Sequence, residues 1–212
     1  MKKALLPIYF AAATILLSAC KKESIGDPPP DNFGPLTTGT NWTYKYTEGT
    51  TSTNFKLTVT NRDTVANGRT YRAVTSSDGS TTYMGKVGSD YYRFASFPGI
   101  GVNSFEELYL KDNKAVNETW TGTASFKYLG TDLTANLNYT LKGKGESRTV
   151  NGKAFNNVTR VRLDISIFGT VVGGGDFYYQ EGVGLIEDII LITVPGAQAY
   201  TSKQEVVSYE IK

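Results

Sequence analysis

The side chains that could carry out chemistry in this chain are few, because it contains no histidine and one cysteine, Cys20. Ser-His-Asp and Cys-His nucleophile systems are therefore excluded, as are zinc sites with imidazole or thiolate ligands. Two carboxylates could still catalyse glycoside hydrolysis if they flanked one bond. The candidate acids are Glu106, Glu107, Glu181, Glu187 and Asp188. Adjacent acids in a strand point to opposite faces, so neither neighbouring pair forms a site alone, and we expect a protein that is not an enzyme.

The sequence contains no clear motif for binding a cofactor or a metal. Asp78-Gly79 and Asp112-Asn113 are turn-forming dipeptides, and neither matches a calcium-binding loop. Gly182-Val183-Gly184 precedes an apolar strand and lacks the helix start that a nucleotide-binding glycine loop requires. We expect no cofactor and no metal, and we interpret these glycines as a bulge or tight bend.

Cys20 closes an apolar stretch, Ala4 to Leu17, that follows two lysines near the start of the chain. Spanning a bilayer takes about 20 apolar residues, so this stretch fits the core of a signal peptide better than a membrane span. A conventional signal peptide followed by an incidental cysteine is the alternative. The sequence Leu17-Ser18-Ala19-Cys20 resembles the lipobox of bacterial lipoprotein precursors. The resemblance implies a diacylglycerol on the Cys20 sulfur, cleavage of residues 1–19 and acylation of the new amino terminus.

Lipidation would place the mature protein on a membrane surface, because two or more acyl chains hold a protein stably. In related carrier pathways an Asp after the lipidated cysteine favours the inner membrane; Lys21 stands there, so the resemblance favours the outer membrane. Periplasmic and outward display both remain open. Removal of the signal peptide takes away two lysines and leaves a net charge of zero. A balanced surface of this kind argues against nucleic-acid binding.

Residues 20–35 read as a lipidated tether, since they contain Pro28-Pro29-Pro30 and almost nothing to bury. The remaining residues, 36–212, form one domain of ordinary size. This domain is β throughout, because apolar residues alternate with polar ones in segment after segment, as in Val161, Leu163 and Ile165. Asn67-Gly68 and Asn151-Gly152 predict two-residue type I′ hairpins, and Gly173-Gly174-Gly175 predicts a further reversal between Phe168 and Phe177.

An internal duplication is suggested by landmarks that recur in the same order, with halves of about 36–104 and 105–212. Trp42, Asn67-Gly68, Tyr83 and Val87-Gly88 are repeated by Trp120, Asn151-Gly152, Tyr179 and Val183-Gly184. Short β motifs also recur by chance, which is the alternative. We expect an all-β fold: a curved antiparallel sheet or half-barrel of roughly 10–12 strands, with a β-sandwich or a closed barrel as alternatives.

Three segments are similar to a family of uncharacterised envelope lipoproteins typical of the Bacteroidota. They are Gly39-Thr40-Asn41-Trp42-Thr43-Tyr44, Val150-Asn151-Gly152-Lys153 with Phe155 and Val158, and Tyr178-Tyr179-Gln180-Glu181-Gly182-Val183-Gly184-Leu185-Ile186. The resemblance implies a curved sheet similar to periplasmic lipoprotein carriers, and it brings no catalytic residues.

Aromatic side chains are the remaining candidates for binding. Ten tyrosines suit sugars, peptides or lipids, although we expect at least two-thirds of them to pack in the core. They are Tyr44, Tyr46, Tyr71, Tyr83, Tyr91, Tyr92, Tyr109, Tyr139, Tyr178 and Tyr179. Phe97, Pro98, Ile100 and Val102 form a candidate contact loop or simply close one end of the core. Asp63-Thr64-Val65 resembles an acceptor for O-linked glycans, which makes Thr64 a candidate modification site.

The sequence leaves two functional hypotheses. In the first, a membrane-anchored envelope lipoprotein binds a small apolar or glycan ligand on the concave face of its β domain. In the second, the domain contacts a protein partner or braces an envelope assembly. An open cavity lined by tyrosines would favour the first hypothesis, and a filled core with an apolar surface patch would favour the second.

Overall fold

The computed structural model of the chain describes residues 33–97, 102–128, 130–193 and 199–212, and every regular element in them is a β-strand. The strands are β1 (Asn41–Glu48), β2 (Thr51–Ala66), β3 (Arg69–Ser76), β4 (Thr81–Val87), β5 (Asp90–Phe97), β6 (Val102–Lys111), β7 (Thr119–Tyr128), β8 (Thr131–Val150), β9 (Lys153–Ile167), β10 (Thr170–Gln180), β11 (Gly184–Ile192) and β12 (Tyr200–Glu210).

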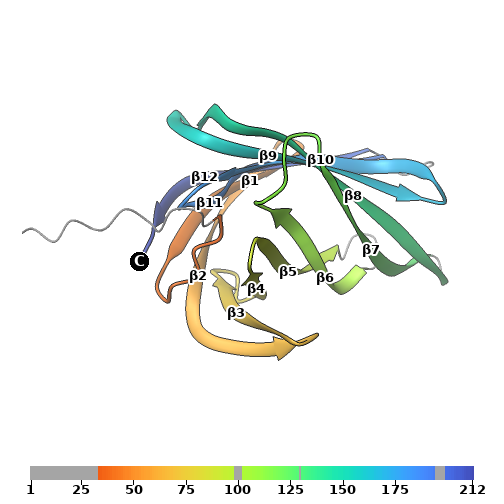
Figure 1. Cartoon of the computed structure of the whole chain (residues 1–212), viewed down its shortest axis with the longest axis horizontal. Helices are drawn as coiled ribbons and strands as arrows, with labels where there is room; N and C mark the ends of the chain where they lie inside the picture. The colour runs from red at the N-terminus through yellow and green to blue at the C-terminus, as the bar shows by residue number, and fades with distance from the viewer. Residues whose placement is uncertain (1–32, 98–101, 129, 194–198) are drawn as a thin grey trace, which may run out of the picture.

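The strands form one nearly closed antiparallel sheet of 12 strands in the order β6-β5-β4-β3-β2-β1-β12-β11-β10-β9-β8-β7 (Figure 1). The first strand pairs with the last, Asn41 opposite Glu210, so the two six-strand halves join in the middle of the sheet. β6 and β7 are its edges, and the Trp120 indole Nε1 on β7 donates a hydrogen bond to the Leu108 carbonyl on β6 at 2.9 Å. The expected all-β curved sheet of 10–12 strands is therefore confirmed.

Among the described residues, no helix is long and apolar enough to cross a membrane.

Because consecutive strands are antiparallel, alternate connections gather at opposite ends of the sheet. We call one end the base; it carries the β2–β3, β4–β5, β6–β7, β8–β9 and β10–β11 connections and the end of β12. The other end, the rim, carries the β1–β2, β3–β4, β5–β6, β7–β8, β9–β10 and β11–β12 connections. In Figure 1 the turns of β7–β8 and β9–β10 lie to the right and the C terminus lies to the left.

Both Asn-Gly hairpins form where the sequence predicts them. Asn67 and Gly68 have φ values of 50° and 73°, and Asn151 and Gly152 have 47° and 77°. Positive φ at both positions is what a type I′ turn requires. The two turns join the second and third strands of each half, and Trp42 and Trp120 are both the second residue of a half's first strand. The landmarks thus occupy matching places, as a duplication predicts.

The reversal predicted at Gly173-Gly174-Gly175 is wrong. The chain turns earlier, at Phe168 and Gly169, whose φ values are 51° and 79°. The three glycines lie inside β10, where a Cβ on Gly174 would come within 2.1 Å of the Leu163 carbonyl oxygen of β9. These glycines therefore serve the close approach of neighbouring strands rather than a turn.

Two clusters of buried side chains fill the inside of the sheet and its base. The first joins β5 and β6 to β7–β10 and includes Tyr109, Leu110, Trp120, Tyr139 and Leu163. The second surrounds Trp42, whose indole Nε1 donates to the Val183 carbonyl at 2.7 Å. It includes the β8–β9 hairpin, which bends across the sheet until Asn151 Nδ2 reaches the Val206 carbonyl of β12 at 2.9 Å. The expected majority of buried tyrosines is confirmed, since seven of the ten are buried.

The last three residues of the predicted tether belong to the packed domain. Phe33 donates its backbone N–H to the Tyr91 hydroxyl at 3.2 Å, and the two rings meet edge to face at 6.3 Å. Gly34 and Pro35 are buried, and a Cβ on Gly34 would lie 3.2 Å from the Tyr109 hydroxyl. The domain therefore begins at or before Phe33, and the chain enters it at the base.

Candidate ligand-binding groove

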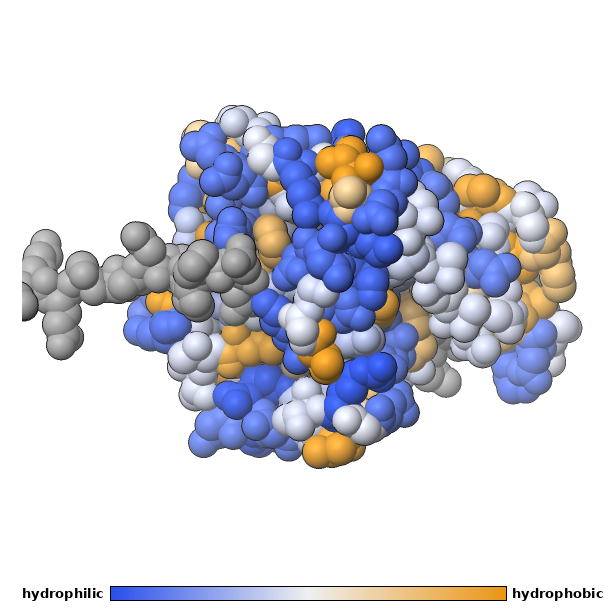
Figure 2. Space-filling model, in the orientation of Figure 1, coloured by the Kyte–Doolittle hydropathy of each residue, from blue (hydrophilic) through white to orange (hydrophobic). Residues whose placement is uncertain are grey.

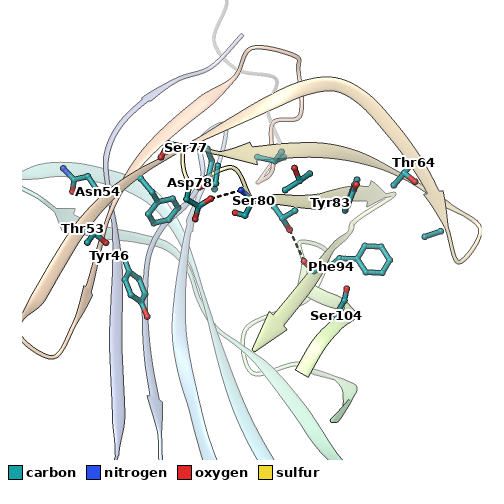
Figure 3. A pocket seen from close by; sticks show the side chains of 17 residues that line it. Tyr46, Thr53, Asn54, Thr64, Ser77, Asp78, Ser80, Tyr83, Phe94 and Ser104 are labelled. Atoms are coloured by element: carbon teal, nitrogen blue, oxygen red, sulfur yellow. Dashed lines mark hydrogen bonds between the residues drawn. The ribbon is translucent and has the colours of Figure 1, made fainter. Parts of the chain in front are cut away.

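A groove of about 1070 Å³ opens on the first half of the sheet, between β1–β2 and β3–β6 (Figure 3). The β3–β4 turn projects into it, and most of its lining comes from the rim halves of the strands. A second, smaller hollow of about 520 Å³ lies over β7–β9. That hollow is lined by Thr, Asn, Ser and Gly residues without an aromatic ring. We therefore take the larger groove as the candidate site.

Four aromatic rings line the groove: Tyr46, Phe55, Tyr83 and Phe94. Tyr83 and Phe94 meet at a right angle, with centroids 6.5 Å apart and an interplanar angle of 89°. Tyr46 and Tyr83 are half-buried, so each keeps an exposed surface. Aromatic faces carry a negative quadrupole and attract the polarised C–H groups of a ligand. The groove thus offers stacking surfaces from four different strands.

Polar groups alternate with these rings. The hydroxyl groups belong to Thr53, Thr64, Ser76, Ser77, Ser80, Thr81, Thr82 and Ser104. Asp78 stands among them on the β3–β4 turn and accepts a hydrogen bond from the Ser80 N–H at 2.9 Å. Hydrogen bonds from the Ser80 side chain and backbone hold the pKa of the Asp78 carboxyl below its usual value. The groove therefore presents one carboxylate and a dense set of hydroxyls that can both donate and accept.

The β3–β4 turn is held rigidly at the edge of the groove. Ser77 donates its N–H to the Lys56 carbonyl at 2.8 Å, and the Lys56 N–H donates to the Ser77 hydroxyl at 3.0 Å. Thr82, just after the turn, donates its hydroxyl to the Phe94 carbonyl at 3.0 Å. These bonds fix the turn to β2 on one side and to β5 on the other, so its polar groups are positioned before any ligand arrives.

Three of the candidate carboxylates, Glu106, Glu187 and Glu181, lie away from the groove, and the first two pair with cations. Glu106 pairs with Arg69 at 3.0 Å, and Glu187 pairs with Arg148 and Lys203. Glu181 lies in the β10–β11 turn at the base. None of these residues lines the groove. The expectation of a non-catalytic protein stays a prediction.

Glu107 and Asp188 are brought together from distant strands, inside the core. The Arg93 guanidinium binds Glu107 through Nε at 2.6 Å, and the Tyr139 hydroxyl donates to the other carboxylate oxygen at 2.8 Å. Burial lowers the pKa of Arg93, but Glu107 together with the neighbouring Tyr179 and Tyr139 outweighs this, and the pKa is raised overall. Burial raises the pKa of Asp188 to about 7, against the attraction of Arg93. This cluster ties β5 and β6 to β8 and β11 within packed side chains rather than in a cleft.

The other predicted site residues fall in different places. Thr64 is half-buried on β2 and lines the groove, and its modification stays a prediction. Phe97 and Val102, which begin and end the candidate contact loop, pair at the ends of β5 and β6. Pro98 and Ile100 lie outside the described residues, as does Cys20. No group of metal-ligating side chains occurs in the described part of the chain.

Sequence reasoning found Tyr46, Tyr83 and Thr64 as candidates and missed most of the groove. Phe55, Phe94 and the hydroxyls of the β3–β4 turn are not among the predicted binding residues. The run Thr75-Ser76-Ser77-Asp78-Gly79-Ser80-Thr81-Thr82 is the one local signal, since hydroxyl residues are concentrated there. A turn rich in Ser and Thr is ordinary. These hydroxyls therefore indicate a binding site only together with the aromatic rings that line the same groove.

Comparison with known proteins shows a shared fold and nothing more specific. No protein-family model matches the sequence, and no curated protein matches it. Two solved structures are similar to it. One is a Bacteroides fragilis protein provisionally described as exported, with a YmcC-like fold; it is 10% identical, with a TM-score of 0.50 and coverage of 84% of this chain and 98% of that one.

The other solved structure is a protein from Parabacteroides distasonis provisionally described as a lipoprotein. It is 12% identical, with a TM-score of 0.48 and the same shares of each chain covered. At such low identity the likeness to the Bacteroides fragilis protein shows the fold alone. The chain is therefore an all-β protein of a fold that also occurs in a protein described as exported.

Proposed function

We propose that this protein is an envelope lipoprotein, anchored through Cys20, whose β domain binds a small ligand in the groove between β1–β2 and β3–β6. The groove carries the proposal, because it combines aromatic faces with fixed hydroxyls in about 1070 Å³, a volume sufficient for a small ligand. The lipobox and the fold shared with a protein described as exported support the envelope location. An outer-membrane location rests on Lys21.

Between an apolar ligand and a glycan, the lining favours a glycan. Eight Ser and Thr residues, Asn54 and Asp78 would have to lose hydration against an apolar ligand without regaining hydrogen bonds. A sugar offers hydroxyls that satisfy them and C–H faces that stack on Tyr83 and Phe94. The ligand we propose is a neutral oligosaccharide.

The anchor is tested by Cys20→Ser. The wild type is expected to stay in the membrane pellet after a carbonate wash, because acyl chains hold it there, and the variant is expected in the supernatant. A conservative Ser18→Ala variant leaves the sulfur in place and serves as the control. Retention of the Cys20→Ser protein in the pellet would contradict the proposal.

The groove is tested by Tyr83→Ala and Asp78→Asn. Each variant should weaken binding of an immobilised neutral oligosaccharide about tenfold, since losing one stacking surface or one fixed acceptor removes about 1.4 kcal/mol of binding energy. Phe168→Ala is the matched control, because this ring is 87% exposed at the rim and does not line the groove.

Native mass spectrometry of protein purified from its own envelope shows which oligosaccharides to test, because a bound ligand adds its mass to the protein. A retained lipid in place of a sugar would decide for the apolar ligand. Equal affinities of Tyr83→Ala, Asp78→Asn and wild type for every bound oligosaccharide would remove the groove from the proposal.

A second candidate function, contact with a protein partner, is favoured by one surface. Phe168, Val171, Ile189 and Leu191 are exposed at the rim of β9–β11, with exposed fractions of 87%, 60%, 37% and 47%. Figure 2 shows hydrophobic surface at the right-hand end, where the turns of β7–β8 and β9–β10 lie. Exposed apolar patches often mark contact sites. A stoichiometric protein that copurifies with wild type and is lost with Phe168→Ser would support this role.

A further inference from the structure

The chain enters the domain at the base, and this entry point bears on which end of the molecule faces the membrane. Phe33 is held by the Tyr91 hydroxyl and ring, and the Tyr91 hydroxyl in turn donates to Asp112 in the β6–β7 connection at 2.9 Å. Pro35 lies against Gly184, where a Cβ would be 3.7 Å from the proline ring. The entry of the chain is therefore fixed among the β4–β5, β6–β7 and β10–β11 connections.

We infer that the base of the sheet rests on the lipid surface that holds the anchor, with the groove opening away from it. The inference depends on the proposed lipidation of Cys20, from which residues 21–32 lead to the fixed entry at Phe33. Fully extended, these 12 residues reach about 40 Å at about 3.3 Å per residue. When the base faces the membrane, the entry at Phe33 lies beside the lipid surface, so the segment is long enough.

The opposite orientation would require the same segment to run along the whole body. β10 alone has 11 residues, and at about 3.3 Å per residue it extends over about 36 Å from base to rim. Residues 21–32 would then have to be almost fully extended, at the limit of about 3.1–3.5 Å per residue. That orientation uses the whole reach of the segment, so the length of the tether favours the base.

The surface chemistry of the base fits a lipid surface with anionic headgroups. The β4–β5 and β6–β7 connections and the adjoining part of β8 carry five lysines against three acids: Lys86, Lys111, Lys114, Lys142 and Lys144 against Asp90, Asp112 and Glu118. The two connections are joined, since the Asp112 N–H donates to the Ser89 carbonyl at 3.0 Å. Lys144 reaches the same loop through the Asp112 carbonyl at 2.7 Å. Lys86, Lys111 and Lys114 pair with the three acids, and the excess of two positive charges is attracted to anionic headgroups.

Two exposed valines accompany these lysines. Val87 on the β4–β5 turn is 52% exposed, and Val116 on the β6–β7 connection is 46% exposed. Apolar side chains flanked by lysines can enter the headgroup boundary while the ammonium groups stay hydrated. At the rim, the acids Glu48, Asp78 and Asp132 and the base Lys127 lie in or directly beside the described turns. The base is therefore the end whose charge suits a bilayer with anionic headgroups, and two exposed valines lie beside its lysines.

The test uses the full lipidated chain in vesicles of phosphatidylethanolamine and phosphatidylglycerol. A cysteine introduced by Val87→Cys, Val116→Cys or Phe168→Cys carries a fluorescent label, because Cys20 is blocked by lipid. Quenchers placed in the headgroup region should quench labels at positions 87 and 116 severalfold more than the label at position 168. All three positions are exposed in the folded protein, so the labels should not disturb packing.

Each result decides the orientation. Stronger quenching at position 168 would overturn the inference and place the apolar rim patch in the bilayer. Equal or negligible quenching at all three positions would also overturn it, because the domain would then tumble freely on its tether. Failure of the labelled proteins to stay with the vesicles would instead refute the anchor, which separates the two proposals. High salt should reduce quenching at positions 87 and 116 if the lysines contribute.

Discussion

Replacing Arg93 by methionine is expected to lower the free energy of unfolding by about 3 kcal/mol, the lower end of the range for breaking a buried ion pair. Arg93 binds Glu107 at 2.6 Å, and the side chain of Glu107 is 2% exposed whereas that of Arg93 is 26% exposed. Methionine keeps much of the volume but leaves a buried carboxylate without its cation. The remaining exposure of Arg93 lets water soften the loss. Urea unfolding followed by fluorescence measures the change.

Lys127→Met provides the matched control, because it breaks an ion pair whose partners are 69% and 81% exposed. Exposed pairs contribute little, so its unfolding curve should overlap that of the wild type. A double variant, Arg93→Met with Glu107→Gln, should recover part of the loss by removing the unpaired charge. If Arg93→Met and Lys127→Met behave alike, the buried pair between β5 and β6 does not stabilise the fold.

The parts of the fold that could be predicted are those encoded locally. Alternation in Val161, Leu163 and Ile165 reports one buried face because the pleat has a period of two, and all three residues are buried. Asn67-Gly68 and Asn151-Gly152 form their hairpins because positive φ is a property of the turn residues themselves. The expected number of strands, 10–12, came from counting such alternating segments and the turns between them, and the sheet has 12.

The error at Gly173-Gly174-Gly175 shows where local reading fails. Glycine suits a turn and a crowded strand equally well, since both exclude a Cβ. The choice between them depends on whether Leu163 and Leu191 of neighbouring strands approach the backbone, which is a property of the assembled sheet. The true turn at Phe168-Gly169 puts an aromatic residue at positive φ, which statistics disfavour.

The candidate groove and the buried cluster could not be predicted for a related reason. Tyr83 and Phe94 are near one another in sequence, but Tyr46 and Phe55 reach the same groove only because β1 pairs with β2, β2 with β3 and β3 with β4. Glu107 and Asp188 belong to different halves and meet only because the first strand pairs with the last. Periodicity gives the face of each residue but not the neighbouring strand.

The stability of the protein is expected to fall by up to about 4 kcal/mol as the pH rises from about 4 to about 7, because of Asp188. Burial raises the pKa of this carboxyl from 3.8 to about 7 in the folded state; Arg93 opposes the shift, and Glu187 and Glu107 reinforce it. Between these two values the unfolded chain is ionised while the folded chain keeps its proton. The unfolded state therefore binds fewer protons, and raising the pH favours unfolding.

Asp188→Asn removes this titration, so the variant should match the wild type near pH 4 and exceed it in stability at pH 8. Asp132→Asn, whose side chain is 81% exposed, is the control and should leave the profile unchanged. The pKa values of Asp78, Glu118 and Glu210 are lowered in the folded state, so these groups lose stabilisation only as the pH falls below about 4.5. Urea midpoints from pH 5 to pH 8 therefore isolate Asp188, and parallel profiles for wild type and Asp188→Asn would show that this carboxyl is ionised in the folded core.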